Sequence, residues 1–423
     1  MCDITVIDSM CGTGKTSYAI DLMNKTDKND MNFMYITPYL DEVKRIKSNV
    51  SNRSFYEPTT KNSKGTKLEG FKQLIIKDMD IASTHSLFTN IDSETYELIK
   101  NSNYTLILDE VMNVIDVKKI SLSDFNILLE QNLIKIEENT NKIIWIDKEY
   151  SGEFDNIKLL AQNDNLYLHS RNKENNKAIL LVWTFPANIF KVFKKVYILT
   201  YMFDGQIQRM YYDMYNIKYE YKSVRYINNE YTLVDYIDYN SEDKTEIKNL
   251  IDIYEGKLNT IGDDRYNLSA SWLKAPKNKN NLVKLKNNTY NYFTNIKKSK
   301  AKYNMWTTIL GTEDKRDKVR LALSGKGYSR SFVSCNCRST NEYSDKNCIA
   351  YLLNRFLNPL EKGFFEDKGI RINEDLWALS ELIQFLWRSA IRNKKPISVY
   401  IPSKRMRQLL IDYLNNNLDK ISS

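Results

Sequence analysis

One short segment of the chain contains residues whose types and spacing suit phosphate binding. It reads Ser9-Met-Cys-Gly12-Thr-Gly14-Lys15-Thr16, and it stands between a β-branched run at 4–7 and a helical pattern at 17–23. The glycines let backbone N–H groups turn toward phosphate oxygens, and the following helix N-terminus adds positive potential. In such a P-loop, Lys15 reaches the β- and γ-phosphates of a nucleoside triphosphate, and the Thr16 hydroxyl ligates Mg²⁺. The expected nucleotide-binding residues are Ser9, Met10, Cys11, Gly12, Thr13, Gly14, Lys15, Thr16 and Ser17.

Two acids end a later apolar run, Leu106-Ile-Leu-Asp109-Glu110. Taken alone, an Asp-Glu pair after a strand is more often a polar loop. After a P-loop, however, it is the natural partner of that motif: Asp109 would hold Mg²⁺ through water, and Glu110 would polarise the attacking water as general base. We therefore expect Asp109 to bind the metal ion and Glu110 to act in catalysis.

A third group lies near the C-terminus, in Gln384-Phe-Leu-Trp-Arg388-Ser-Ala-Ile-Arg392. The pattern predicts an amphipathic helix from 377 to 391, on which Gln384, Arg388 and Arg392 share one face. Arginines in so apolar a segment are costly to bury without an anion, so they suit recognition of a γ-phosphate. A surface stripe that pairs with Glu381 explains the same pattern equally well.

These residues need elements to position them, and the sequence predicts a parallel sheet. Apolar, β-branched runs at 4–7, 33–36, 80–82, 104–108, 142–146, 178–182 and 195–199 alternate with helical patterns. Such continuous runs are typical of strands that are covered on both faces. We therefore expect an α/β domain over residues 1–205. Polar residues that follow its second and third strands, Thr37-Pro38 and Ser83-Thr84-His85, would lie at the edge where parallel sheets bind ligands.

The remainder, residues 206–423, is predicted to hold a second α/β domain after a Tyr/Asn/Lys-rich insertion at about 206–300. Strands are expected at 219–224, 303–309, 332–334 and 397–401, and a further helix at 404–414. Basic residues at 274–286 and 297–300 are candidate phosphate contacts, although a solvated face is the commoner role of such runs.

Composition agrees with a globular chain of two domains. The 423 residues are 42% hydrophobic and 27% charged, with a net charge of +9 that suits a polyanionic partner such as nucleic acid. Five cysteines, no signal-peptide pattern and no apolar run near 18 residues predict a soluble, reduced, cytoplasmic protein without membrane contact. The cysteines lack a fourth ligand at zinc spacing, so Mg²⁺ is the one metal expected.

The ordered set of motifs resembles superfamily 2 helicases, specifically the DEAD-like helicases of bacteriophages and other mobile elements. The segment from Ser9 to Thr16 resembles motif I, Asp109-Glu110 resembles motif II, and the segment from Gln384 to Arg392 resembles motif VI. The resemblance also covers residues that such helicases use for nucleic-acid contacts: Thr37, Pro38, Ser83, Thr84, His85, Thr200, Arg338, Thr340 and Asn341.

The resemblance implies two RecA-like P-loop NTPase domains, with ATP and Mg²⁺ bound between them and single-stranded or forked nucleic acid, most naturally DNA, across both. Lys15, Asp109 and Glu110 would act in hydrolysis together with Gln384 and one arginine. The family usually has its second arginine seven residues after the glutamine, so Arg388 and Arg392 are both candidates, with Arg392 slightly favoured. Replication proteins would be further partners.

Two other functions fit parts of the sequence. An ATP-gated nucleic-acid-binding module or loader would use the same P-loop as a switch. A terminase-like DNA packaging ATPase would also join a P-loop domain to a second domain, but it would carry a nuclease carboxylate cluster that the sequence does not display. An ATP-dependent helicase or translocase of phage-type replication or recombination accounts for the most motifs.

Overall fold

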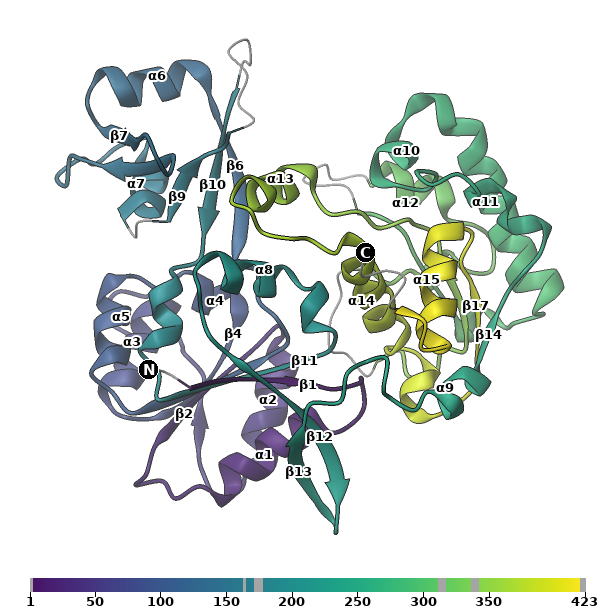
Figure 1. Cartoon of the computed structure of the whole chain (residues 1–423), viewed down its shortest axis with the longest axis horizontal. Helices are drawn as coiled ribbons and strands as arrows, with labels where there is room; N and C mark the ends of the chain where they lie inside the picture. Colours follow the sequence, from purple (N-terminus) through teal and green to yellow (C-terminus); the bar gives the residue numbers. More distant parts are fainter. Residues whose placement is uncertain (1–2, 163–164, 171–177, 311–316, 336–341, 419–423) are drawn as a thin grey trace. The chain divides into compact units, whose positions relative to one another are not determined.

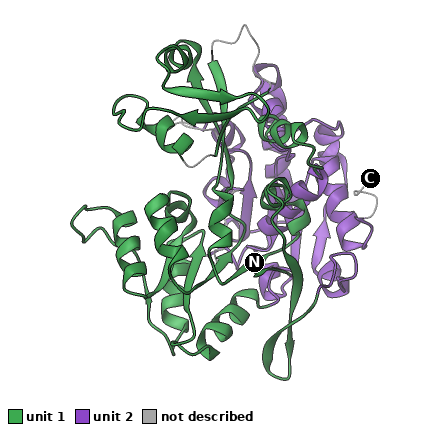
Figure 2. Ribbon diagram, turned by 60° about the vertical axis from the view of Figure 1, so that its left-hand side comes forward, with its two compact units in different colours: residues 1–8, 14–235, 358–372 green, residues 9–13, 236–357, 373–423 purple. Residues whose placement is uncertain are grey.

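The computed structural model divides the chain into two compact units (Figure 2). Residues 3–162, 165–170, 178–310, 317–335 and 342–418 are described. The first unit comprises residues 1–8, 14–235 and 358–372, and the second comprises residues 9–13, 236–357 and 373–423.

The first unit is built on an eight-stranded sheet of order β13-β12-β1-β11-β5-β2-β4-β3 (Figure 1). All neighbours pair in parallel except the β12–β13 hairpin. The expected apolar runs form the central strands, whose residues are almost entirely buried, as sheets covered on both faces require. The strands are β1 (Asp3–Asp8), β2 (Asn32–Thr37), β3 (Phe55–Tyr56), β4 (Asp80–Thr84), β5 (Tyr104–Asp109), β11 (Lys195–Thr200), β12 (Glu220–Ile227) and β13 (Glu230–Asp235).

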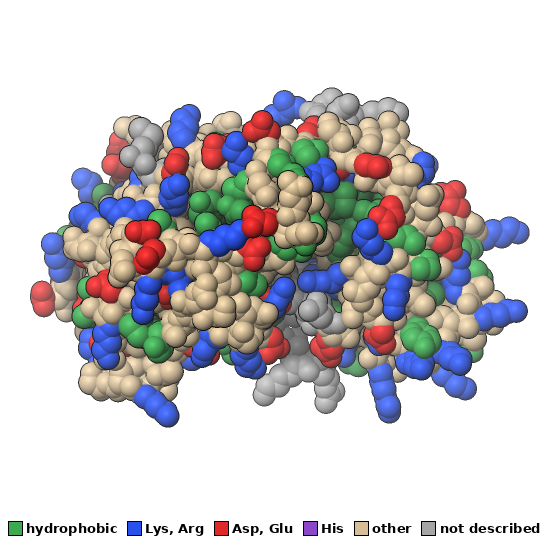
Figure 3. All heavy atoms as spheres, turned by 90° about the horizontal axis from the view of Figure 1, so that it is seen from below, with side chains coloured by type: hydrophobic (Ala, Val, Ile, Leu, Met, Phe, Trp, Pro, Cys, Tyr) green, Lys and Arg blue, Asp and Glu red, His purple; other side chains and the backbone are tan. Residues whose placement is uncertain are grey.

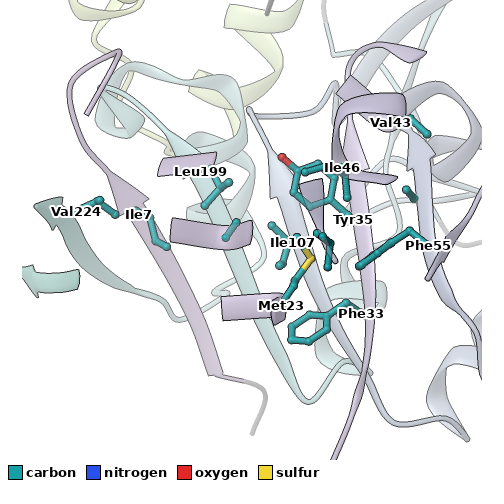
Figure 4. Packing of buried hydrophobic residues seen from close by; sticks show 13 residues of the cluster. Ile7, Met23, Phe33, Tyr35, Val43, Ile46, Phe55, Ile107, Leu199 and Val224 are labelled. Carbon is teal, nitrogen blue, oxygen red and sulfur yellow. The ribbon is translucent and has the colours of Figure 1, made fainter. Parts of the chain in front are cut away.

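Helices α1 (Lys15–Lys25) and α2 (Leu40–Asn49) bury their apolar sides against this sheet. Ala19 and Met23, one helical turn apart, project from α1 into a core that includes Ile7, Ile107 and Leu199 of the sheet (Figure 4). Strand β1, which leads into residues 9–16, is thus held by the strands paired with it and by helix α1 packed on its face. The unit's other α-helices outside residues 115–184 are α3 (Lys67–Ile76), α4 (His85–Thr89), α5 (Ser93–Lys100), α8 (Ile207–Met214) and α13 (Pro359–Asp367).

A second, antiparallel sheet of order β6-β10-β9-β8-β7 belongs to the same unit. The expected strands at 142–146 and 178–182 exist, but they pair here and not in the parallel sheet, so that part of the prediction is wrong. An apolar run shows that a strand is buried without showing which strand it pairs with. The elements are β6 (Ile115–Ser121), α6 (Leu122–Glu130), β7 (Ile134–Glu137), β8 (Lys142–Trp145), α7 (Asp155–Gln162), β9 (Leu166–Leu168) and β10 (Ala178–Thr184).

Helix α13 packs on this antiparallel sheet, although the helix and the sheet are far apart in the sequence. A ring nitrogen of His169 lies 2.9 Å from the Leu360 carbonyl oxygen, and the Tyr167 and Phe364 rings are 5.7 Å apart. Ser170 also bonds the Asp367 carboxylate. These contacts explain why residues 358–372 belong to the first unit.

The second unit has a four-stranded parallel sheet of order β14-β17-β16-β15. The strands expected at 303–309 and 397–401 are confirmed in shorter form, whereas Phe332 makes only a single bridge to Trp306 in place of the strand expected at 332–334. The elements are α9 (Thr245–Leu250), β14 (Ile251–Ile253), α10 (Ala270–Lys274), α11 (Lys279–Asn291), β15 (Asn304–Thr307), α12 (Lys318–Leu323), β16 (Cys348–Tyr351), α14 (Glu374–Leu386), β17 (Ile397–Tyr400) and α15 (Lys404–Leu414).

The first unit extends past the boundary expected at residue 205. Strand β12 pairs with β1 through Thr5, Val6 and Ile7, which carries the chain as far as Asp235 into the first unit. A long connection hid this pairing from the sequence pattern. The expected α/β fold class is confirmed, because both units contain a parallel sheet together with helices.

Candidate nucleoside-triphosphate site

Residues 9–16 form a tight loop between β1 and α1. Gly12 and Gly14 have φ values of 87° and 98°, a region that other residues rarely adopt. The Thr13 N–H and hydroxyl both donate to the Met10 carbonyl, at 3.3 and 2.9 Å, which closes the turn. Gly14 stands at the N-cap of the eleven-residue helix α1 and provides no side-chain cap, and the N-terminus of such a helix favours an anion.

Strand register brings the predicted acids to the same edge as this loop. Asp8 at the end of β1 pairs in register with Thr200 of β11, and Leu199 of β11 pairs with Asp109 of β5. The Lys15 ammonium lowers the pKa of both Asp8 and Asp109 by its charge, so it lies within electrostatic reach of both carboxylates. Lys15 and Asp109, which the sequence predicted to act together, are therefore brought together.

Asp109 is buried, and its pKa is raised to about 7. Desolvation by burial is the main cause, and the negative charges of Glu110 and Glu42 act in the same direction against Lys15. The Thr37 hydroxyl lies 3.5 Å from the Asp109 Oδ2 atom, at the outer limit of a hydrogen bond. The Tyr35 hydroxyl and the charge of Lys15 compensate the burial only in part. A bound cation would favour the ionised form further.

Glu110 has a strained backbone and an unsatisfied carboxylate oxygen. Its φ is 67°, and its N–H donates to the Leu199 carbonyl at 2.9 Å, which fixes the residue to β11. Its Oε2 atom is buried and has no hydrogen-bond partner within the part of the chain that the structure describes. Strain of this kind persists only where surrounding structure imposes it, and it often marks functional positions. An acceptor without a donor is what a general base for water requires.

The predicted Mg²⁺ residues, Thr16 and Asp109, supply one hydroxyl and one carboxylate. This donor set fits Mg²⁺, which commonly keeps several waters and takes its other oxygens from substrate phosphates. Among the described residues, no group of three or more His, Cys, Asp or Glu side chains could hold a metal ion by itself.

Asp8 contributes to this edge, although sequence reasoning did not select it. Its carboxylate accepts from the Met202 and Phe203 N–H groups at 2.8 and 2.9 Å, and Met202 adopts a φ of 57°. Burial is the main reason that the pKa of Asp8 is raised to about 7. Asp8 thus ties the start of the loop at residues 9–16 to the segment after β11. An acid that directly follows Ile4-Thr-Val-Ile7 was the available signal.

Tyr231 of β13 is a second residue that the sequence did not reveal. A Cβ atom added at Gly14 would overlap the Tyr231 ring, so this glycine is required by a close approach as well as by its φ. The Tyr231 ring also packs on that of Tyr226, with centroids 4.9 Å apart. The β12–β13 hairpin therefore covers one side of the loop.

The residues predicted to contact nucleic acid differ in how far they are buried. Thr37, Ser83 and Thr200 are buried, and the Thr200 hydroxyl has no hydrogen-bond partner among described residues. Pro38, Thr84 and His85 are half-buried at the ends of β2 and β4, as expected for the carboxyl edge of the sheet. Their contacts with nucleic acid stay predictions. Three further predicted positions, Arg338, Thr340 and Asn341, lie outside the described residues.

The predicted single helix face in the second unit is wrong. Helix α14 contains Gln384 but ends at Leu386, and Ser389 then has an extended backbone. The Ser389 hydroxyl donates to the Leu386 carbonyl at 2.6 Å, which is how serine competes with helix continuation. Arg388 therefore lies past the helix end, and Arg392 lies in a separate 3₁₀ turn, Ala390–Asn393.

The two arginines differ in environment. Arg388 is 3% exposed, and its guanidinium donates to the Ser334 and Cys335 carbonyls at 3.1 and 3.4 Å. Arg392 is exposed, and no ion pair or side-chain hydrogen bond is found for it within the described residues. The nearby Arg355, which the sequence did not single out, pairs with Glu381 at 2.7 Å. A role as arginine finger stays a prediction for both candidates.

Comparison with known proteins places the chain. A protein of Bacillus subtilis (strain 168), described as SPbeta prophage-derived uncharacterized protein YonV, is 46% identical over 426 residues, which cover 98% of this chain and 99% of that protein. The chain belongs to the YonV family. Models of the YonV middle domain and of the YonV C-terminal Rossmann-like domain match residues 115–183 and 245–414, which correspond to the antiparallel sheet and to the sheet of the second unit.

A further model matches the N-terminal part of this YonV family member. The model of the type III restriction enzyme res subunit matches residues 3–147, which confirms the resemblance to superfamily 2 helicases and to their ATPases. Among solved structures, an XPD helicase is similar over 99% of this chain and 95% of its own, with 11% identity and a TM-score of 0.47. S. tokodaii Xpd4 is similar over 97% and 94%, with the same identity and TM-score.

Proposed function

We propose that this YonV family member is an ATP-dependent nucleic-acid translocase or helicase that acts on DNA. The observation that supports this most is the arrangement at the carboxyl edge of the first sheet, where the phosphate-binding loop, Lys15, Asp109 and Glu110 meet. The match to a helicase-type ATPase domain agrees with it. The prophage origin of the relative supports a role in phage replication or recombination in the cytoplasm of a bacterial host.

In the proposed reaction, the N–H groups of the loop and of α1 bind the phosphates, and Lys15 stabilises charge on the β- and γ-phosphates. Mg²⁺, when bound, would neutralise developing charge on the phosphate oxygens. Glu110 Oε2 accepts a proton from the water that attacks the γ-phosphorus, so its free acceptor position is used during the reaction. Asp8 keeps the segment after β11 in position beside these groups.

The proposed partner is a single-stranded or forked nucleic acid, bound at the carboxyl ends of the strands. His85, Thr84 and Pro38 are its candidate contacts on the first unit because they are half-buried at this edge. No described helix has the length and apolar character needed to span a bilayer. An ATP-gated binding module is the second candidate, since the buried Asp8 and Met202 contacts also suit a switch that turns over slowly.

Steady-state ATP hydrolysis with and without single-stranded DNA tests the proposal. We expect DNA to raise turnover many-fold, and Lys15→Ala to abolish it. Lys25→Ala is the matched control because this exposed lysine lies at the other end of α1. Loss of hydrolysis in Lys15→Ala without any DNA stimulation of the native protein would favour the ATP-gated module. Hydrolysis that survives in Lys15→Ala would contradict the site itself.

A further inference from the structure

The positive charge of this protein is concentrated in one segment. Residues 265–312 include ten Lys and Arg residues and no Asp or Glu, which leaves 52 basic and 53 acidic residues in the rest of the chain. The net charge of +9 therefore comes from a segment of 48 residues. Over much of the face drawn in Figure 3, by contrast, basic and acidic side chains stand next to each other.

This segment is longer than its place in the fold requires. It forms most of the crossover from β14 to β15, which are the two edge strands of the second unit's sheet. A parallel crossover needs roughly a dozen residues, whereas residues 254–303 include α10, α11 and several 3₁₀ turns. The additional helices are therefore not needed merely to connect the strands.

The crossover is firmly anchored by its uncharged side chains. Leu282, Leu285 and Thr289 of α11 are buried, and Asn288 donates to the Leu258 carbonyl at 3.1 Å. The buried Asn278 donates to the Trp272 carbonyl at 2.9 Å, which fixes the junction between α10 and α11. The apolar stripe of α11 is thus used inside the unit, so this helix does not offer the large free apolar face of a membrane-surface helix.

The lysines of the crossover remain in solvent. One member of the segment, Lys297, forms an ion pair with Asp252, and the Lys302 ammonium lies over the Tyr303 ring. No ion pair with an acidic residue is found, among described residues, for the exposed group of Lys274, Lys277, Lys279, Lys284, Lys298 and Lys300. Exposed cations without acidic partners among described residues give this segment a positive potential that attracts a polyanion.

We propose that residues 274–302 bind the sugar–phosphate backbone of duplex DNA without sequence preference. Duplex DNA has one phosphate per roughly 1.7 Å of its axis and is bound mainly through such charges. A single-strand site would need a row of exposed aromatic rings for base stacking. Here exposed rings are few, with Tyr266 and Tyr290 as the main examples. This proposal rests on the proposed translocase function. It adds that the second unit binds the duplex part of a forked DNA substrate.

The test measures binding of a 30-base-pair duplex, a single-stranded 30-mer and anionic lipid vesicles by the full-length protein at several salt concentrations. The variant that removes four positive charges is Lys274→Gln, Lys277→Gln, Lys279→Gln and Lys284→Gln. A control that removes four exposed, unpaired charges from the first unit is Lys28→Gln, Lys47→Gln, Lys61→Gln and Lys77→Gln.

We expect the crossover variant to bind the duplex more weakly. Its plot of log affinity against log salt concentration should become less steep by about 0.9 for each phosphate contact that is lost. The control should change both quantities much less. Equal losses in the two variants, or equal losses for duplex and single strand, would overturn the proposal, as would binding to vesicles in preference to duplex. ATP hydrolysis without DNA should be unchanged in both variants, whereas it disappears in Lys15→Ala, so failure of this proposal is distinguishable from failure of the ATPase assignment.

Discussion

The carboxyl edge of the first sheet and the region around the end of α14 both contain buried charged groups, but their surroundings differ. At the first edge, Asp109 and Glu110 form no ion pair among described residues, and burial raises the pKa of Asp109. Around α14, Arg355 is paired with Glu381, and Arg388 donates to two carbonyl groups.

The first edge therefore has a buried acceptor, Glu110 Oε2, without a donor among described residues. The region around α14 pairs its charges but has two buried donors, Arg355 Nε and Gln384 Nε2, without an acceptor among described residues. Uncompensated buried carboxylates reduce stability, so they are expected where a cation, a water molecule or a nucleotide completes the set. A buried arginine that donates to carbonyl groups stabilises the unit that contains it, whether or not it also contacts a nucleotide. The comparison therefore predicts different outcomes for substitutions in the two regions.

The largest effect is expected at Glu110. Glu110→Gln keeps the shape and removes the proton acceptor, so kcat for ATP hydrolysis should fall by about 10²- to 10⁴-fold. Because the substitution changes neither the loop nor Lys15, the KM for ATP should change little. Steady-state kinetics and nucleotide binding measure both quantities. A loss of ATP binding equal to the loss of turnover would show that Glu110 is structural.

A smaller effect is expected at Arg388, and it should appear in stability. Arg388→Ala leaves the Ser334 and Cys335 carbonyls without their donors, which should lower the free energy of unfolding by about 1–3 kcal/mol. Arg392→Ala, at an exposed position, should change it by less than about 0.5 kcal/mol. Urea denaturation distinguishes the two variants. If Arg392→Ala retains its stability but loses ATP hydrolysis, Arg392 is the arginine finger, and the second region also contributes chemistry.

The mildest expected effect is the pH dependence caused by the buried carboxyls. Burial raises the pKa of Asp109 from 3.8 to about 7, so the folded state keeps a proton that the unfolded chain has already lost. The free energy of unfolding of the nucleotide-free protein should therefore fall as the pH rises from about 4 to about 7. Over the upper part of that range, affinity for Mg²⁺–ATP should rise because the ionised carboxylate is the form that binds a cation.

Asp109→Asn tests the assignment of this pH dependence. The variant should show a weaker dependence of stability on pH in denaturation experiments at pH 5 and pH 7.5, and it should lose the gain in nucleotide affinity. Asp8→Asn is the matched comparison: Asp8 also has a pKa raised to about 7 but contacts backbone N–H groups. Asp8→Asn should weaken the dependence of stability on pH, but the affinity for Mg²⁺–ATP should still rise with pH.

The sequence alone determined the turn at residues 9–16 and the position of the acids at the end of β5, because local spacing and an apolar strand are sufficient to define them. Glycines before Lys15 impose the turn, and the run that ends in Asp109 reaches the edge of any parallel sheet. Sequence also predicted most strands of the large sheet and the helix at 404–414, whose patterns are strong. These features can be recognised from the spacing and periodicity of residues that are close in sequence.

Tertiary structure alone decided the features that depend on distant pairing. The antiparallel sheet took two strands that sequence assigned to the parallel sheet, and β12 paired with β1 across a long connection. Likewise, Tyr231 reaches Gly14, and Asp8 bonds Met202, from positions far apart in the chain. The end of α14 before Arg388 was decided by a serine hydroxyl that bonds the helix backbone. Periodicity shows which side of an element is buried, but it does not show which partner buries it.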